Sequence, residues 1–165
     1  MNEVIKAIKE RRSHRSYTNK KISKEVLEEI IDCARLAPSA NNVQPWEFVV
    51  ITDKETLRRV ASITDYGKFI GHAAACIIVL CKDTKYYLED GCAATENILI
   101  AAESFGIGSC WVAGDKKHYC NKILELIGAP KNYKLVSILS LGYYDKPLEP
   151  YGKRSLKDVI HWEKF

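Results

Sequence analysis

Three arginines and a serine lie within five residues near the N-terminus, in the sequence RRSHR at residues 11–15. Arginine offers forked N–H donors that match phosphate oxygens, and the hydroxyl of Ser13 can both donate and accept a hydrogen bond. Taken alone, Arg11, Arg12 and Arg15 also suit a solvated helix end, where cations complement the helix dipole. The serine between them favours an anion site in this arginine segment.

A second basic pair, Lys153 and Arg154, follows a turn in the sequence PYGKRSL near the other end of the chain. By itself this pair is typical of a solvated loop. Together, the two clusters predict one anion site that forms only when the chain folds. Both are compact rather than parts of a continuous stripe, which favours a phosphate-bearing small molecule over a nucleic acid duplex.

Amide and hydroxyl side chains are concentrated in PSANNVQPWEF, residues 38–48. Ser39, Asn41, Asn42 and Gln44 can each donate and accept, which suits the edge of a heteroaromatic ring. The alternative is a helix stop followed by an Asx-type turn, with Trp46 packed in the core. These residues alone leave both interpretations of the amide loop (residues 38–44) open.

Small residues in GIGSCWVAG, residues 106–114, would let the backbone approach a flat ligand closely. Their spacing is not that of a dinucleotide fingerprint, and the chain contains no P-loop and no G-x-S-x-G elbow. The four histidines have no metal-ligand spacing. We therefore predict no metal site, and we assign no side chain as a catalytic acid, base or nucleophile.

The composition is that of a soluble globular protein. At 165 residues, with 47% hydrophobic and 28% charged residues, the chain is long enough to bury a core, and we expect a single domain over residues 1–165. The six cysteines contain no C-x-x-C pair, so we expect reduced thiols. No apolar run is long enough for a membrane helix, and the N-terminus lacks a signal-peptide core, which favours a cytoplasmic location.

The elements that must position these residues alternate between helices and strands. Hydrophobic periodicity and capping residues predict helices near residues 4–10, 24–36, 53–63, 89–106 and 115–128, and strands near 46–51, 73–81 and 134–144, with 108–114 as a strand or loop. This pattern predicts an α+β fold with a sheet covered by helices. The helix over 89–106 is apolar nearly all round, which suggests that a second subunit covers it.

Four segments in this order resemble the flavin-dependent nitroreductase family: RRSHRSY, PSANNVQPWEFVV, DGCAATENILIAAESFGIGSCW and KRSLKDVIHWEKF. The resemblance extends over nearly the whole chain. It implies a nitroreductase-like α+β fold with a central, mainly antiparallel sheet flanked by helices. It also implies an interlocked homodimer with exchanged C-terminal tails and one FMN at each end of the dimer interface.

The same resemblance implies the roles of single residues at the phosphate end of the cofactor. Arg11, Arg12 and Ser13 match the family's contacts with the phosphate and the ribityl chain. Lys153 and Arg154 match its C-terminal phosphate contacts.

Further residues match contacts with the flavin ring, namely Arg15, Pro38, Ser39, Asn42, Ala113 and Gly114. Arg15 falls where the family places a cation near the pyrimidine edge, which would stabilise negative charge on reduction. Pro38, Ser39 and Asn42 would reach the flavin bound mainly by the partner subunit, whereas Gln44, Pro45 and Trp46 would fix the loop and begin the strand. The backbone of Ala113 and Gly114 would lie against the ring and serve its N5 region.

A ping-pong reaction is the activity that the resemblance implies. NADH or NADPH would reduce the flavin, and a small electron-poor acceptor, such as a nitroaromatic or a quinone, would then take its place. One alternative is a flavin-binding or storage protein without catalysis. Another is a small basic nucleic-acid-binding domain, which we disfavour because aromatic residues are not interleaved with the basic clusters.

Overall fold

The computed structural model describes residues 2–165, apart from the side chain of Ala113. One sheet contains four strands, β1 (Trp46–Ile51), β2 (Ala75–Lys82), β3 (Gly108–Ala113) and β4 (Tyr133–Gly142), in the order β1-β2-β4-β3. Every neighbouring pair is antiparallel. The predicted antiparallel sheet is confirmed, and residues 108–113 form a strand rather than a loop. β1 and β3 are the edge strands, each with one side unpaired in the sheet.

The described residues 2–165 also form five α-helices and three short 3₁₀ helices: α1 (Glu3–Glu10), α2 (Lys24–Arg35), η1 (Ala40–Asn42), α3 (Lys54–Ile63), η2 (Lys68–His72), α4 (Tyr87–Ser104), α5 (Cys120–Leu126) and η3 (Leu156–Asp158). Side-chain caps begin α1, α2 and α3, and the sequence predicts those of α2, at Ser23, and of α3, at Thr52 or Asp53. Ser23 Oγ accepts a hydrogen bond from the Val26 N–H at the start of α2, and Asp53 caps α3 in the same way.

The helix predicted over 115–128 is shorter than expected, because the chain first makes a turn. Lys116 has a φ of +64°, and the Lys117 N–H donates to the Gly114 carbonyl at 3.3 Å. A non-glycine residue in the left-handed region cannot continue a right-handed helix. α5 therefore begins only at Cys120.

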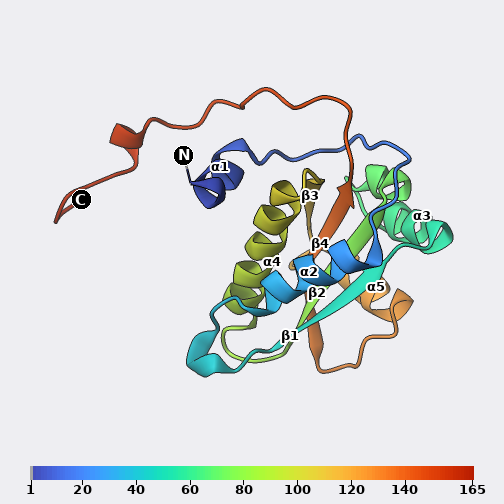
Figure 1. Cartoon of the computed structure of the whole chain (residues 1–165). Helices are drawn as coiled ribbons and strands as arrows, with labels where there is room; N and C mark the ends of the chain where they lie inside the picture. Colours follow the sequence, from blue (N-terminus) through green and yellow to red (C-terminus); the bar gives the residue numbers. More distant parts are fainter. Residues whose placement is uncertain (1) are drawn as a thin grey trace.

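The two faces of the sheet carry separate cores. α2 and α4 pack on one face against Ile77 and Leu139, while α3, η2 and α5 pack on the other against Ile78 and Ile138. Figure 1 shows α4 and α3 on opposite sides of the sheet. β2 is buried on both faces, as its continuous apolar sequence predicts.

The C-terminal segment after β4 lies apart from these cores. Residues 145–165 are exposed at every position, and in Figure 1 the segment leaves β4 and ends well away from the sheet. Its apolar side chains include Trp162, which is 77% exposed. The apolar side chains of this C-terminal segment are therefore not covered by any hydrophobic surface of their own chain.

Candidate active site

The arginine segment is attached to the edge strand β3. Ser13 forms an isolated parallel bridge with Ser109, and the His14 N–H donates to the Ser109 carbonyl at 2.9 Å. α1 ends just before it, where the Arg11 N–H donates to the Ala7 carbonyl. The end of α1 and the start of β3 thus place the arginines along one edge of the sheet.

Two aromatic rings pack behind the segment. The imidazole of His14 stacks on Tyr144 with ring centroids 3.8 Å apart, and burial lowers the pKa of His14. A Cβ at Gly108 would lie 2.7 Å from both rings, too close for any side chain. His14 is therefore a packing residue in this chain, and Gly108 makes room for it.

Tyr17 anchors the chain that follows the arginines. Its hydroxyl donates to the His14 carbonyl at 2.6 Å and lies 2.7 Å from Ser140 Oγ on β4. Burial raises the pKa of Tyr17, so the phenol stays protonated and can donate. A Cβ at Gly142 would lie 2.7 Å from the Tyr17 ring. The position of the arginine segment thus depends on glycines in two strands.

Two buried polar atoms near the arginine segment have no partner. Of the described residues, only Arg12 Nε, Thr84 Oγ1 and Ser109 Oγ are buried side-chain atoms without a hydrogen bond. Two of these three therefore belong to the arginine segment and to the β3 residue that pairs with it. Arg12 Nη1 donates to the Lys9 and Arg11 carbonyls at 2.8 Å each, which orients the guanidinium. Buried polar groups are nearly always satisfied, so the free atoms suit a polar ligand.

Arg15 is the exposed member of the segment. Its Nη1 donates to the Ser13 carbonyl at 3.2 Å, and its guanidinium lies 5.9 Å from the centroid of the Phe69 ring. The structure thus leaves this cation open to a ligand.

The amide loop is held in an unusual conformation. Asn41, Asn42 and Gln44 all have φ between 51° and 54°, a backbone conformation that residues other than glycine rarely adopt. Ser39 Oγ accepts from the Gln44 N–H, and the Ala40 N–H donates to Asp90 Oδ1, both at 2.9 Å. A turn of this kind was one interpretation of the loop, and strain in an exposed loop is also typical of ligand contacts.

The arginine segment and the amide loop lie at opposite ends of α4. Asp90, which holds the amide loop, is in the first turn of the helix, and Glu103 is in the last. Burial raises the pKa of Glu103, and the charges of Arg11 and Arg12 oppose that rise, which places the arginines beside this last turn. Thirteen residues of helix extend about 20 Å. The two segments of one chain therefore do not meet.

Gly114 lies at the far end of β3 from the arginine segment. From Ser109 to Ala113 the strand extends about 13 Å, so a flat ligand can lie along it. A Cβ at Gly114 would be 2.9 Å from the Val136 carbonyl oxygen, so only glycine fits. The backbone of Ala113 pairs with Ser137 in the sheet, and its side chain lies outside the described part of the structure.

Lys153 and Arg154 are not brought to the arginine segment by this chain. Both lie in the exposed C-terminal segment, where Arg154 donates to the backbone carbonyl of Asp158. In the described part of the chain, no hydrogen bond or ion pair joins them to residues 11–15.

A family model described as the nitroreductase family matches residues 8–66 and 62–143. The chain belongs to the nitroreductase family. A protein of Archaeoglobus fulgidus whose name combines NADH dehydrogenase and NAD(P)H nitroreductase is 41% identical over 175 residues, with 100% of both chains covered. This membership identifies the chain as a nitroreductase-type flavin oxidoreductase that uses NAD(P)H, as the sequence predicts.

Solved structures of the nitroreductase family have the same fold. An FMN-dependent nitroreductase from Clostridium difficile is 30% identical with a TM-score of 0.91, and the match covers 98% of this chain and 99% of that one. A nitroreductase of Desulfovibrio desulfuricans in complex with FMN is 27% identical with a TM-score of 0.88, over 100% and 99% of the chains. The predicted nitroreductase-like α+β fold is confirmed.

Three residues around Gly114 were not predicted from the sequence: Tyr87, Asp115 and Cys120. The thiol of Cys120 donates to the Gly114 carbonyl at 2.7 Å, and the Tyr87 hydroxyl donates to Asp115 Oδ1 at 2.9 Å. Tyr87 lies in α4, Asp115 in the turn after β3 and Cys120 in α5, so no single motif in the sequence contains all three. The one signal was that Asp115 and Cys120 closely follow the glycine-rich segment.

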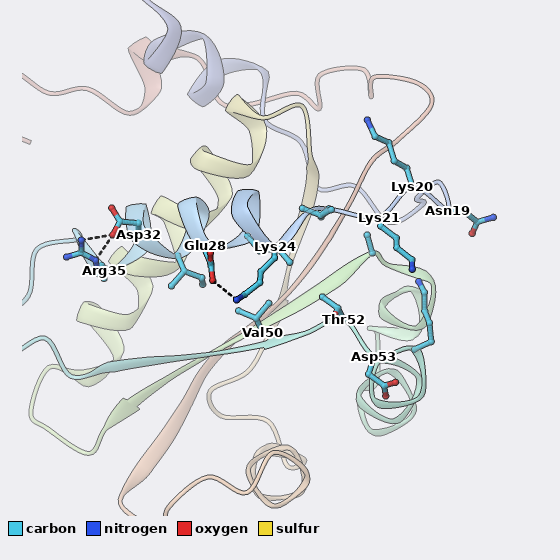
Figure 2. A pocket seen from close by; sticks show the side chains of 15 residues that line it. Asn19, Lys20, Lys21, Lys24, Glu28, Asp32, Arg35, Val50, Thr52 and Asp53 are labelled. Carbon is cyan, nitrogen blue, oxygen red and sulfur yellow. Dashed lines mark hydrogen bonds and ion pairs between the residues drawn. The ribbon is translucent and has the colours of Figure 1, made fainter.

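A hollow of about 920 Å³ lies elsewhere, between α2 and the free edge of β1. Figure 2 shows the Lys24–Glu28 ion pair and the Arg35–Asp32 contact along one side of it, and Val50 of β1 on the other. Among the described residues that line it there is no predicted cofactor contact. We refer to it as the β1 groove.

No helix in residues 2–165 combines the length and the apolar character needed to cross a membrane. The same residues contain no cluster of three or more His, Cys, Asp or Glu side chains that could hold a metal ion.

Proposed function

We propose that this nitroreductase-family chain binds FMN along β3, with the phosphate and ribityl chain at Arg11, Arg12 and Ser13 and the ring near Gly114. The observation that carries the proposal is the pair of unsatisfied buried atoms, Arg12 Nε and Ser109 Oγ, at one end of an edge strand of matching length. The donor set fits the cofactor, because guanidinium and hydroxyl groups suit phosphate and ribityl oxygens. The relatives named for FMN support the same assignment.

Bound FMN would supply the hydride and electron chemistry, and the protein would supply binding, orientation and charge. The exposed guanidinium of Arg15 provides a positive charge for the pyrimidine edge of the ring, which stabilises the reduced form. The backbone at Gly114 packs too closely against β4 for any side chain, and in this proposal the outer face of that backbone lies against the ring. NADH or NADPH is the reductant in this proposal. A small electron-poor acceptor, a nitroaromatic or a quinone, binds in turn at the same open site.

The active form in this proposal is a homodimer. The arginine segment and the amide loop lie at opposite ends of α4, so one flavin meets both only if a second copy supplies Pro38, Ser39 and Asn42. The exposed C-terminal segment would likewise cross to the partner and bring Lys153 and Arg154 to its phosphate.

The partner's C-terminal segment lies along the β1 groove in this arrangement. The free edge of β1 has unpaired backbone N–H and C=O groups, which an added strand satisfies. The groove is also where the apolar side chains of the C-terminal segment gain cover, since their own chain provides none.

The test is a visible absorption spectrum of the purified protein with FMN, recorded anaerobically before and after addition of NADH or NADPH. We expect flavin bands that bleach with at least one of them and return when a quinone is added. Parallel double-reciprocal plots of rate against the two substrates would support the ping-pong scheme. Flavin bands that neither reductant bleaches would favour a binding or storage protein, and failure to bind FMN would overturn the proposal.

A further inference from the structure

Three neighbouring elements hold the backbone on the C-terminal side of Gly114. From α5, the Cys120 thiol donates to the Gly114 carbonyl at 2.7 Å. From α4, the Tyr87 hydroxyl donates to the carboxylate of Asp115 at 2.9 Å, and from β4 the Val136 carbonyl accepts from the Asp115 N–H at 3.3 Å. The peptide unit between Gly114 and Asp115 is therefore fixed at its oxygen, at its nitrogen and through the next side chain.

Both side-chain donors are protonated at neutral pH. Burial raises the pKa of the Cys120 thiol, and burial together with the Asp115 hydrogen bond raises the pKa of Tyr87 to about 12. Neither group therefore acts as a nucleophile or a base here, because each needs its proton to donate. Their chemistry fits a positioning role.

The turn after β3 does not need the thiol in order to close. The Lys117 N–H already donates to the Gly114 carbonyl at 3.3 Å, and the Cys120 N–H donates to the Lys117 carbonyl at 3.1 Å. The Cys120 thiol adds a second donor to a carbonyl whose turn hydrogen bond is already made. Its effect is to restrict rotation about Gly114, the residue with the most conformational freedom.

We propose that Cys120 and the Tyr87–Asp115 pair are positioning residues that hold the Gly114 backbone in the conformation that receives the flavin ring. This inference rests on the proposed function, because it assumes that FMN lies against Gly114. A backbone held in place before binding loses less freedom when the ligand arrives, so the cofactor binds more tightly. The same restraint fixes the direction of the backbone groups that face the ring.

The experiment compares Cys120→Ala, which loses the donor, with Cys120→Ser, which keeps one, and with Tyr87→Phe, which loses the other donor. FMN affinity is measured by quenching of flavin fluorescence, and the midpoint potential of bound FMN by anaerobic reductive titration. Cys33→Ala, at a half-buried thiol of α2, is the matched control. Urea unfolding of each variant reports whether the fold is intact.

We expect Cys120→Ala and Tyr87→Phe to bind FMN about threefold to tenfold more weakly, as the loss of one hydrogen bond implies, and to shift its midpoint potential. Cys120→Ser should stay within about twofold of wild type, like the control. Wild-type affinity and potential in both Cys120→Ala and Tyr87→Phe would overturn the inference while leaving FMN binding intact. Equal losses in Cys120→Ala and Cys120→Ser would also overturn it, because the thiol would then be filling space. If the wild-type chain binds no FMN, the proposed function itself fails.

Discussion

The carboxylate of Asp90, only 5% exposed in the first turn of α4, accepts a hydrogen bond from the backbone N–H of Ala40 at 2.9 Å. This contact joins residues fifty positions apart and holds the amide loop against the end of the central helix.

Replacement of Asp90 by alanine should therefore loosen the amide loop. The Ala40 N–H would lose its acceptor in a partly buried site, which costs about 1–3 kcal/mol. Urea unfolding measures this loss, and FMN affinity should fall with it. Asp90→Asn keeps an acceptor and should lose less, whereas Glu96→Ala, at an exposed position of the same helix, should behave as wild type. Equal stability of Asp90→Ala and wild type would contradict this role.

Replacement of Gly142 by alanine should displace Tyr17 and the arginine segment that it anchors. The new Cβ would lie 2.7 Å from the Tyr17 ring, an overlap that costs about 1–3 kcal/mol when the ring must move. We expect a lower free energy of unfolding and weaker FMN binding. Gly71→Ala is the control, because its nearest contact of 3.5 Å is ordinary. An unchanged FMN affinity in Gly142→Ala would show that the position of Tyr17 does not affect FMN binding.

Replacement of Arg15 by alanine should make the midpoint potential of bound FMN more negative. Reduction adds negative charge to the pyrimidine edge of the ring, and the exposed guanidinium would no longer stabilise it. A shift of tens of millivolts is expected, since about 30 mV corresponds to 1.4 kcal/mol for two electrons. Anaerobic titration measures it, with Arg59→Ala on the exposed face of α3 as the control. A midpoint potential equal to that of wild type would show that Arg15 does not stabilise the reduced flavin.

Alkaline pH should destabilise the fold through Cys76. Burial in β2 raises the pKa of this thiol from 9.0 to about 12, so the unfolded chain loses the proton first as the pH rises. The contribution of this thiol to the free energy of unfolding is complete below pH 9. It is lost as the pH rises toward 12, by up to about 1.4 kcal/mol for each pH unit. Urea unfolding from pH 8 to 11 should show a shallower decline in Cys76→Ala than in wild type. Identical slopes would exclude this thiol as a cause.

Removal of residues 146–165 should convert a dimer into a monomer. The exposed apolar side chains of this segment, Trp162 among them, contact no core of their own chain and would cover the partner in the proposed dimer. Sedimentation velocity measures the change, and Trp162→Ala should weaken association in the same direction. Lys164→Ala, two residues away, is the control. A wild-type chain that sediments as a monomer would contradict the proposed homodimer.

Much of the secondary structure follows from the sequence, because its causes are local. The hydroxyl of Ser23 and the carboxylate of Asp53 cap the helices that they precede, and the unbroken apolar run of β2 makes a strand buried on both faces. The turn after β3 does not follow from the local sequence in the same way. The helical pattern after Gly114 does not reveal that Lys116 takes a left-handed conformation, so α5 was predicted to start too early.

The residue types alone indicate which side chains suit a flavin cofactor, because charge, hydrogen-bonding groups and the absence of a side chain are properties of the residue type. The places of these residues depend on tertiary packing. Ser13 meets Ser109, and Ala40 meets Asp90, through packing between elements that are distant in the chain. The length of α4 keeps the arginine segment and the amide loop apart, since a rigid helix holds its two ends at a fixed distance. That separation, which no local pattern encodes, is the physical reason to expect that two chains form each site.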